Sequence, residues 1–326
     1  MNIMGELKHN ITRILVDIDP DKQEQPALNR AMQFAAHNKV FIKLFSCLSY
    51  PSIVVGTSLN LTQQESTKAA IIAVHEQRLA ELVKENTVEN VTFETEVMWQ
   101  SPVYLGILRA VDAFEADILI KASQPHSNVA RWFFTPTDWY LLKTCSVPIL
   151  LVKQPSWSQT STVVAALDPG HELSQQSELD QRILSTAYTV ARQLGAPLHA
   201  VHCFNPGYRD RLFAGLVKSA LWEKVFPAAT QTDEAKIMEN LRYEHNAQFA
   251  RECVDWVPNS ANQHLLSGAI DEVLPPALPE LHAGILVLGT TYRSGLLGST
   301  AQELVETVDC DILGVKPKDF EAPPHW

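Results

Sequence analysis

A glycine-containing segment in the second half of the chain offers the clearest chemistry. It runs from Gly289 to Thr300 and places Gly295 and Gly298 shortly before Ser299 and a stretch of helical period. Glycines let backbone N–H groups approach phosphate oxygens, and a helix N-terminus adds a favourable dipole. The segment therefore predicts a phosphate-binding loop. The alternative is that its glycines only make a tight strand-to-helix connection, with Ser299 or Thr300 as the helix cap.

Two aspartates are the next candidates, because each follows an apolar, strand-like run and precedes a proline. They are Asp19 and Asp168. An aspartate at the carboxyl end of a strand can contact a ligand, but one before proline often satisfies backbone N–H groups of a turn. Both interpretations stay open.

Other catalytic and metal-binding patterns fit less well. Asp17 and Asp19 form the Asp-x-Asp of a phosphatase nucleophile, but the second half has Ala166 in place of Asp17, and no accompanying lysine and acidic pair is evident. His199 and His202 lie three apart in a strand-like run, so they should point to opposite faces. No P-loop, H-E-x-x-H or G-x-S-x-G pattern occurs. We therefore predict neither an enzyme nor a metal site.

The elements that must position these residues form an internal repeat. A polar, proline-containing stretch separates the two copies and predicts domains over residues 1–154 and 155–326. The repeated segments, in the same order in both copies, are 13–20 and 162–169, 115–120 and 282–287, and 145–153 and 310–316.

Within each copy, β-branched runs alternate with stretches of helical period, which predicts an α/β fold with a five-stranded parallel sheet. Such sheets bind ligands at the carboxyl ends of their strands. The expected strands are 13–18, 40–46, 91–97, 117–121 and 148–153, then 163–167, 198–203, 262–266, 284–288 and 312–315; the expected helices are 26–38, 64–85, 102–113 and 136–144, then 177–194, 233–254, 270–280 and 300–308.

Three segments resemble the universal stress protein family in its tandem form: Phe134 to Trp139, Ala283 to Thr290, and Leu297 to Glu303. The resemblance implies two adenine nucleotide alpha hydrolase-like domains with strand order 3-2-1-4-5, packed as a pseudo-dimer through their fifth strands. It also implies a cytoplasmic stress-response protein. Many members bind ATP through Gly-x-x-Gly, nine residues, then Gly-Ser or Gly-Thr.

The two copies differ in how well they match that motif. The first-copy loop after Lys121 has no glycine, so we expect no nucleotide there. The second copy has Tyr292 for the second glycine, and a shorter spacing to Gly298. Gly268 ends the third strand at the same edge of the sheet. The resemblance thus implies ATP only in the second domain, at Asp168, Gly268, Gly289, Gly298, Ser299 and Thr300.

Composition narrows the class of partner. The chain has 326 residues, of which 46% are hydrophobic, enough for two packed domains. The net charge of −11 opposes binding to nucleic acid. No apolar run is long enough for a membrane span, and no secretory signal begins the sequence. Five cysteines without a C-x-x-C pair indicate reduced thiols in the cytoplasm.

An insertion in the second copy supports an alternative function. Residues 206–226 have an amphipathic helical pattern and follow the second strand, at the ligand edge of the sheet. They are most simply core-facing, but they could form a lid over an apolar pocket or a partner surface. The alternative is therefore a nucleotide-independent scaffold that binds an apolar or lipid-like molecule. Slow ATP hydrolysis and further homodimerisation also stay open.

Overall fold

The structure is a computed structural model of the whole chain. It describes residues 10–36, 38–50, 61–125, 132–153, 156–158, 160–169, 174–205, 231–290, 299–318 and 320. The expected domain boundary, between residues 154 and 155, lies outside the described residues.

The first half contains the expected alternation of strands and helices. A short antiparallel pair, β5 and β6, lies where we expected only a loop. The elements are β1 (Arg13–Asp17), α1 (Pro26–Ala35), β2 (Val40–Leu48), α3 (Leu61–Asn86), β3 (Val91–Trp99), α4 (Val103–Phe114), β4 (Ile118–Ala122), β5 (Gln124–Pro125), β6 (Trp132–Phe133), α5 (Pro136–Thr144) and β7 (Ile149–Val152).

The second half repeats this order, and every strand and helix expected from the sequence is present. Its elements are β8 (Thr162–Leu167), α6 (Ser174–Leu194), β9 (Leu198–Phe204), α9 (Gln231–Cys253), the 3-10 helix η2 (Ser260–Asn262), β10 (Gln263–Ser267), α10 (Ile270–Glu280), β11 (Ala283–Gly289), α11 (Ser299–Thr307) and β12 (Asp311–Val315).

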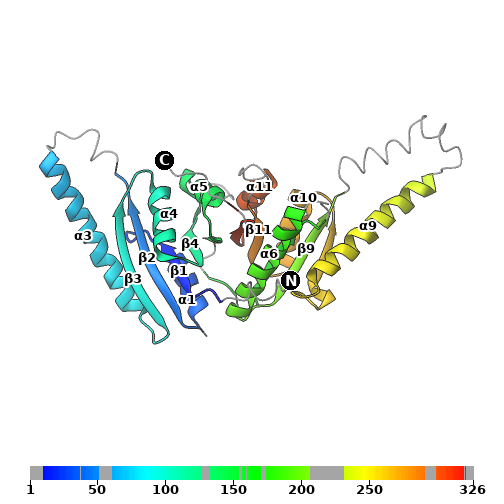
Figure 1. Cartoon of the computed structure of the whole chain (residues 1–326), viewed down its shortest axis with the longest axis horizontal. Coiled ribbons are helices and arrows are strands. Elements are labelled where there is room, and N and C mark those ends of the chain that lie inside the picture. The colour runs from blue at the N-terminus through cyan, green and yellow to red at the C-terminus, as the bar shows by residue number, and fades with distance from the viewer. Residues whose placement is uncertain are drawn as a thin grey trace.

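The two halves join into one ten-stranded sheet (Figure 1), in the order β10-β9-β8-β11-β12-β7-β4-β1-β2-β3. Within each half the strands are parallel and follow the expected order 3-2-1-4-5. The fifth strands, β7 and β12, pair antiparallel, with Leu313 opposite Leu150. This pairing confirms that the fifth strands meet at a pseudo-two-fold axis.

Helices cover both faces of the sheet and bury two apolar layers. On one face, α1, α6 and α9 contribute buried side chains such as Phe34, Leu184 and Phe249. On the other face, α4, α5, α10 and α11 contribute Ile107, Leu141 and others. The strands read as continuous apolar runs because a parallel sheet is covered on both faces.

Two buried lysines connect the halves reciprocally. Lys153, which follows β7, donates to the backbone carbonyls of Val305 and Val308 at the end of α11. Lys316, which follows β12, donates to the carbonyl of Leu142 in α5 and to Thr290 Oγ1. Each lysine thus satisfies carbonyls that a helix C-terminus leaves unpaired, in the opposite half of the molecule.

A buried ion pair also crosses between the halves. Arg30 of α1 lies 2.7 Å from Asp311 of β12, and the two side chains are 1% and 0% exposed. The indole of Trp157, between the two halves, donates to the same carboxylate at 2.9 Å. The Arg30 guanidinium lies 3.5 Å from the centre of the Trp157 ring. These three residues are called the Arg30 clasp below.

Candidate functional site

The structure brings some of the predicted nucleotide-site residues together at one edge of the sheet. Asp168 directly follows β8, and Gly289 ends β11, the neighbouring strand. Helix α11 begins at Ser299. Gly268 follows β10, and β9 lies between β10 and β8 in the sheet. Gly298 and the side chains of Ser299 and Thr300 lie outside the described residues.

At Gly268 and Gly289, the two described glycines of the predicted site, a side chain would clash with its surroundings. Gly268 has a φ of +142°, and a Cβ there would lie 2.4 Å from Val273 Cγ1. A Cβ on Gly289 would lie 2.8 Å from Leu179 Cδ2, so this glycine lets α6 pack closely against β11. These contacts explain two of the glycines by packing and backbone conformation, whereas Gly295 and Gly298, on which the choice between a phosphate-binding loop and a tight connection depends, lie outside the described residues.

Asp168 has an exposed side chain. Its backbone N–H donates a hydrogen bond to a second aspartate, which the sequence analysis did not single out. Asp180 of α6 accepts the Asp168 N–H on both carboxylate oxygens, each at 3.3 Å. Asp180 is 1% exposed. Burial, followed by the charges of Glu252 and Asp168, raises the pKa of Asp180 to about 8. A protonated carboxyl thus positions the turn that presents Asp168.

The histidines of β9 behave as the strand geometry predicts. His199 stacks on His264, with 2.9 Å between their ring nitrogens. His202 instead stacks on His245 of α9, with 3.4 Å between ring nitrogens. Burial lowers the pKa of both His199 and His202. Within the described residues, no group of three or more His, Cys, Asp or Glu side chains is placed to hold a metal ion.

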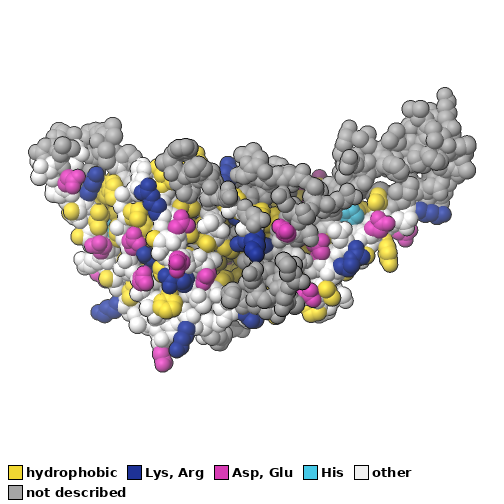
Figure 2. Space-filling view, viewed as in Figure 1, with side chains coloured by type: hydrophobic (Ala, Val, Ile, Leu, Met, Phe, Trp, Pro, Cys, Tyr) yellow, Lys and Arg dark blue, Asp and Glu magenta, His cyan; other side chains and the backbone are white. Residues whose placement is uncertain are grey.

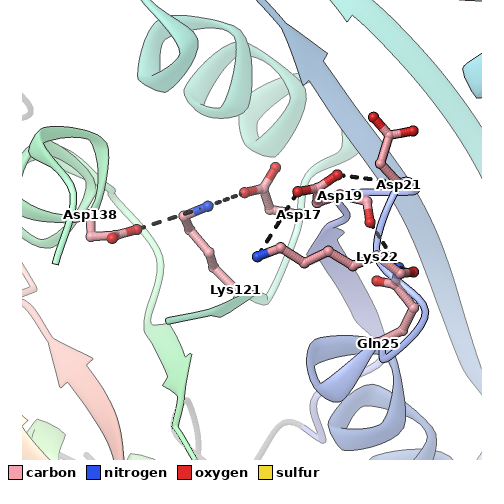
Figure 3. Close-up of polar contacts among 7 residues, drawn as sticks. All are labelled: Asp17, Asp19, Asp21, Lys22, Gln25, Lys121 and Asp138. Carbon is pink, nitrogen blue, oxygen red and sulfur yellow. Dashed lines mark hydrogen bonds and ion pairs between the residues drawn. The ribbon is translucent and has the colours of Figure 1, made fainter. Parts of the chain in front are cut away.

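The equivalent edge of the first half carries a cluster of mostly buried charged side chains (Figure 3). Lys121 of β4 pairs with Asp17, its register partner on β1, and lies 3.8 Å from Asp138 of α5. Their side chains are 18%, 11% and 2% exposed. Although burial alone would lower it, the carboxylates of Asp17 and Asp138 raise the pKa of Lys121. These three residues are called the Lys121 cluster below.

Sequence reasoning considered Asp17 as a candidate but did not connect it with Lys121 or Asp138. Asp138 lies in the first turn of α5, where it forms a capping box with Thr135. Its second oxygen, Oδ1, has no hydrogen-bond partner among the described residues. The available signal was Lys121 itself, a charged residue in the otherwise apolar strand Ile118–Ala122. A lysine does therefore accompany Asp17, although within the described residues no group of acidic side chains is placed to hold a metal ion beside it.

Asp19 acts as a turn residue. Its carboxylate accepts the N–H of Asp21 at 3.2 Å and lies 3.9 Å from the ammonium of Lys22. Its backbone carbonyl accepts from the side chain of Gln25 at 2.8 Å (Figure 3). In the first half, the structure thus supports the turn interpretation of this aspartate.

The five cysteines are free, and burial raises the pKa of every thiol, to about 11 for Cys145 and about 12 for the other four. Thiols of such high pKa are poor nucleophiles, which agrees with a packing role.

The described surface carries charges of both signs. On the face shown in Figure 2, the described basic and acidic side chains are interspersed. Across the described part of the chain, no helix combines the length and apolarity that a membrane span requires. The insertion at 206–226, and the lid suggested for it, lie outside the described residues.

Comparison with known proteins shows which family the chain resembles. Residues 10–153 match the model of the universal stress protein family. Universal stress protein E of Photorhabdus laumondii is 28% identical over 96% of this chain and 98% of its own length. The Escherichia coli K12 protein of the same name is 26% identical over 95% of each chain.

Solved structures show the same fold. A functionally unknown protein from Pseudomonas aeruginosa PAO1 has a TM-score of 0.69 at 24% identity, over 98% of this chain and 96% of its own. A universal stress protein from Archaeoglobus fulgidus has a TM-score of 0.62 at 12% identity, over 95% and 100%. With its repeated five-stranded halves, the chain therefore carries a match to the universal stress protein family over residues 10–153 and resembles, over nearly its whole length, the relatives named universal stress protein E.

Proposed function

We propose that this chain is a non-catalytic, cytoplasmic stress-response protein with one adenine-nucleotide site, in its second half. The site comprises Asp168 and Gly289 on adjacent strands, the start of α11 at Ser299 and Thr300, and Gly298 before it, with Gly268 further along the same edge. The first half contributes fold and interface but binds no nucleotide.

The observation that carries the proposal is a difference in charge between the halves. In the first half, the carboxyl-terminal parts of β1 and β4 contribute Asp17 and Lys121, and α5 adds Asp138. In the second half, the corresponding positions of β8 and β11 are Ala166 and Leu288, which are uncharged. A triphosphate at the first edge would approach two carboxylates that share one ammonium, a net negative charge, whereas the corresponding strand positions of the second edge are uncharged and lie beside a helix N-terminus, with Asp168 further along the loop.

ATP titration followed by native mass spectrometry tests this proposal. Asp168→Ala is the test variant, and Asp19→Ala is its matched control, because Asp19 occupies the repeat-equivalent position in the first half. We expect one ATP per chain in the wild type and in Asp19→Ala, and at least tenfold weaker binding in Asp168→Ala. Gly298→Val should also weaken binding, because its side chain would block the approach of phosphate.

Other results would contradict the proposal. Two nucleotides per chain, or equal effects of the two aspartate variants, would contradict a single second-half site. ADP accumulating over time would show hydrolysis and contradict the non-catalytic assignment. A copurified mass other than a nucleotide, together with no ATP binding, would favour the alternative of an apolar or lipid-like ligand. An empty and inert protein would favour a scaffold.

A further inference from the structure

Two tyrosine rings lie face to face between helices α4 and α5, which pack against each other (Figure 1). Tyr104 is in the first turn of α4, and Tyr140 is in α5. Their ring centroids are 4.5 Å apart, and their planes are within 9° of parallel. At this separation, carbons of the two rings are in van der Waals contact. The other tyrosine ring contacts within the described residues are with tryptophans.

Both rings are open to solvent. Tyr140 is 49% exposed, and Tyr104 is partly exposed. Small dissolved oxidants therefore reach the pair, and water can accept the phenolic protons.

The helices that carry the two tyrosines are anchored in one apolar layer. Leu108, one turn after Tyr104, is 3% exposed, and Leu141, next to Tyr140, is 0% exposed. The two rings therefore stay neighbours in the folded chain. Groups held together in this way react with each other far more readily than the same groups on separate molecules.

The cysteines do not provide a peroxide-sensitive site that would react first. Burial raises their pKa to about 11 or about 12, and a thiol has to ionise before it reacts with peroxide as a nucleophile. Oxidants that remove one electron at a time do not need a thiolate, and they react with exposed phenols.

We infer that Tyr104 and Tyr140 are a site of oxidative modification, where a one-electron oxidant such as a peroxyl radical joins the two rings into dityrosine. The product connects α4 to α5 covalently. This inference does not depend on the proposed nucleotide site, which is in the other half of the molecule.

The reaction proceeds in balanced steps. Each phenol gives one electron to an oxidant molecule and its O–H proton to water, which leaves two phenoxyl radicals. The radicals combine through one new bond between ring carbons ortho to the oxygens. The hydrogen on each of these carbons then moves to the phenol oxygen as a proton, through water, and restores both aromatic rings. The pair loses two electrons and two protons in total, and the oxidant is reduced.

Peroxyl radicals from the thermal decomposition of the azo compound AAPH test this inference on dilute full-length protein. Trypsin separates the two tyrosines, because Arg109 and Arg131 lie between them. We expect dityrosine fluorescence in chains that keep the monomer size under denaturing conditions. Mass spectrometry should find peptide 85–109 joined to peptide 132–143, with two hydrogen atoms fewer than their sum.

Three phenylalanine variants assign the crosslink. Tyr104→Phe and Tyr140→Phe should each lower the dityrosine yield at least about tenfold, because each removes a phenol and keeps the ring. Tyr243→Phe is the matched control. Tyr243 is 74% exposed, so exposure alone would favour oxidation there over Tyr140. Its variant should keep the yield of the wild type.

The peptide map of the wild type identifies the joined residues without any variant, so the test holds even if a variant is unstable. Absence of dityrosine in a wild type whose other side chains are oxidised would overturn the inference. A crosslink at Tyr243, a crosslink mainly between two chains, or an unchanged yield in Tyr140→Phe would each overturn it as well.

Discussion

Lys121 stands between two carboxylates, and removing it would leave both of them without its charge in a mostly buried place. Lys121→Leu copies Leu288 of the second half. We expect it to lower the free energy of unfolding by about 3–5 kcal/mol, because breaking a buried ion pair on one side leaves an uncompensated charge. Thermal denaturation at pH 7 measures the effect.

The double variant Asp17→Ala, Lys121→Leu is the matched control, because it copies both Ala166 and Leu288. Replacing a buried pair with apolar groups costs much less than breaking it. The double variant should therefore recover more than half of the stability lost by Lys121→Leu. A double variant as unstable as the single one would show that Lys121 stabilises the fold through packing and not through charge.

Asp180 makes a pH-dependent contribution to stability. Its pKa is raised to about 8, so between about pH 4 and pH 8 the folded chain binds a proton at this side chain that the unfolded chain releases. Stability from this group is therefore lost as the pH rises through that window. Asp180→Asn keeps a carbonyl acceptor for the Asp168 N–H and carries no charge. At pH 8.5, it should be more stable than the wild type by at least about 1 kcal/mol.

The difference should disappear at pH 4, where both side chains are neutral. Melting temperatures of the two proteins across this range provide the measurement. A stability difference that does not change with pH would contradict a buried, proton-binding Asp180.

At the scale of elements, the sequence predicts the fold better than the site. Strands such as Ile14 to Val16 are apolar on both faces, and helices such as Pro26–Ala35 carry a periodic apolar face, so local patterns suffice to locate them. The Lys121 cluster joins three elements far apart in the chain. No local pattern encodes that convergence, although the register of β1 against β4 produces it.

The C-termini of two helices depend on the reciprocal lysines. Burial lowers the pKa of Lys153 to about 8 and that of Lys316 to about 7. In the unfolded chain both lysines stay protonated up to about pH 10.5. Between the lowered pKa of each lysine and pH 10.5, folding therefore releases a proton, and the contribution of these groups to the free energy of unfolding rises with pH. Lys316→Met should remove part of this rise. The change in its melting temperature between pH 7 and pH 9.5 should be less positive than the change in the wild type, because the other titrating groups act equally in both proteins.

Lys153→Met provides the reciprocal test in the opposite half, with the same sign and a window that begins about one pH unit higher. Equal pH profiles for the wild type and both variants would mean that these lysines do not change protonation on folding.

At the scale of the whole molecule, a continuous sheet and the Arg30 clasp make the two halves one cooperative unit. Asp311 also accepts the backbone N–H of Lys153 at 2.8 Å, so one carboxylate holds α1, the segment at Trp157 and the end of β7. Asp311→Leu would leave the Arg30 guanidinium buried and without its carboxylate. We expect a loss of about 3–5 kcal/mol.

Differential scanning calorimetry distinguishes a loss of cooperativity from a simple loss of stability. The wild type should unfold in one transition, whereas Asp311→Leu should unfold in two, because the interface then opens before either half melts. Adding Arg30→Met removes the buried charge and should restore much of the melting temperature, although the indole of Trp157 stays without its acceptor. A single, unshifted transition in Asp311→Leu would mean that the β7–β12 pairing and the reciprocal lysines hold the halves together without the clasp.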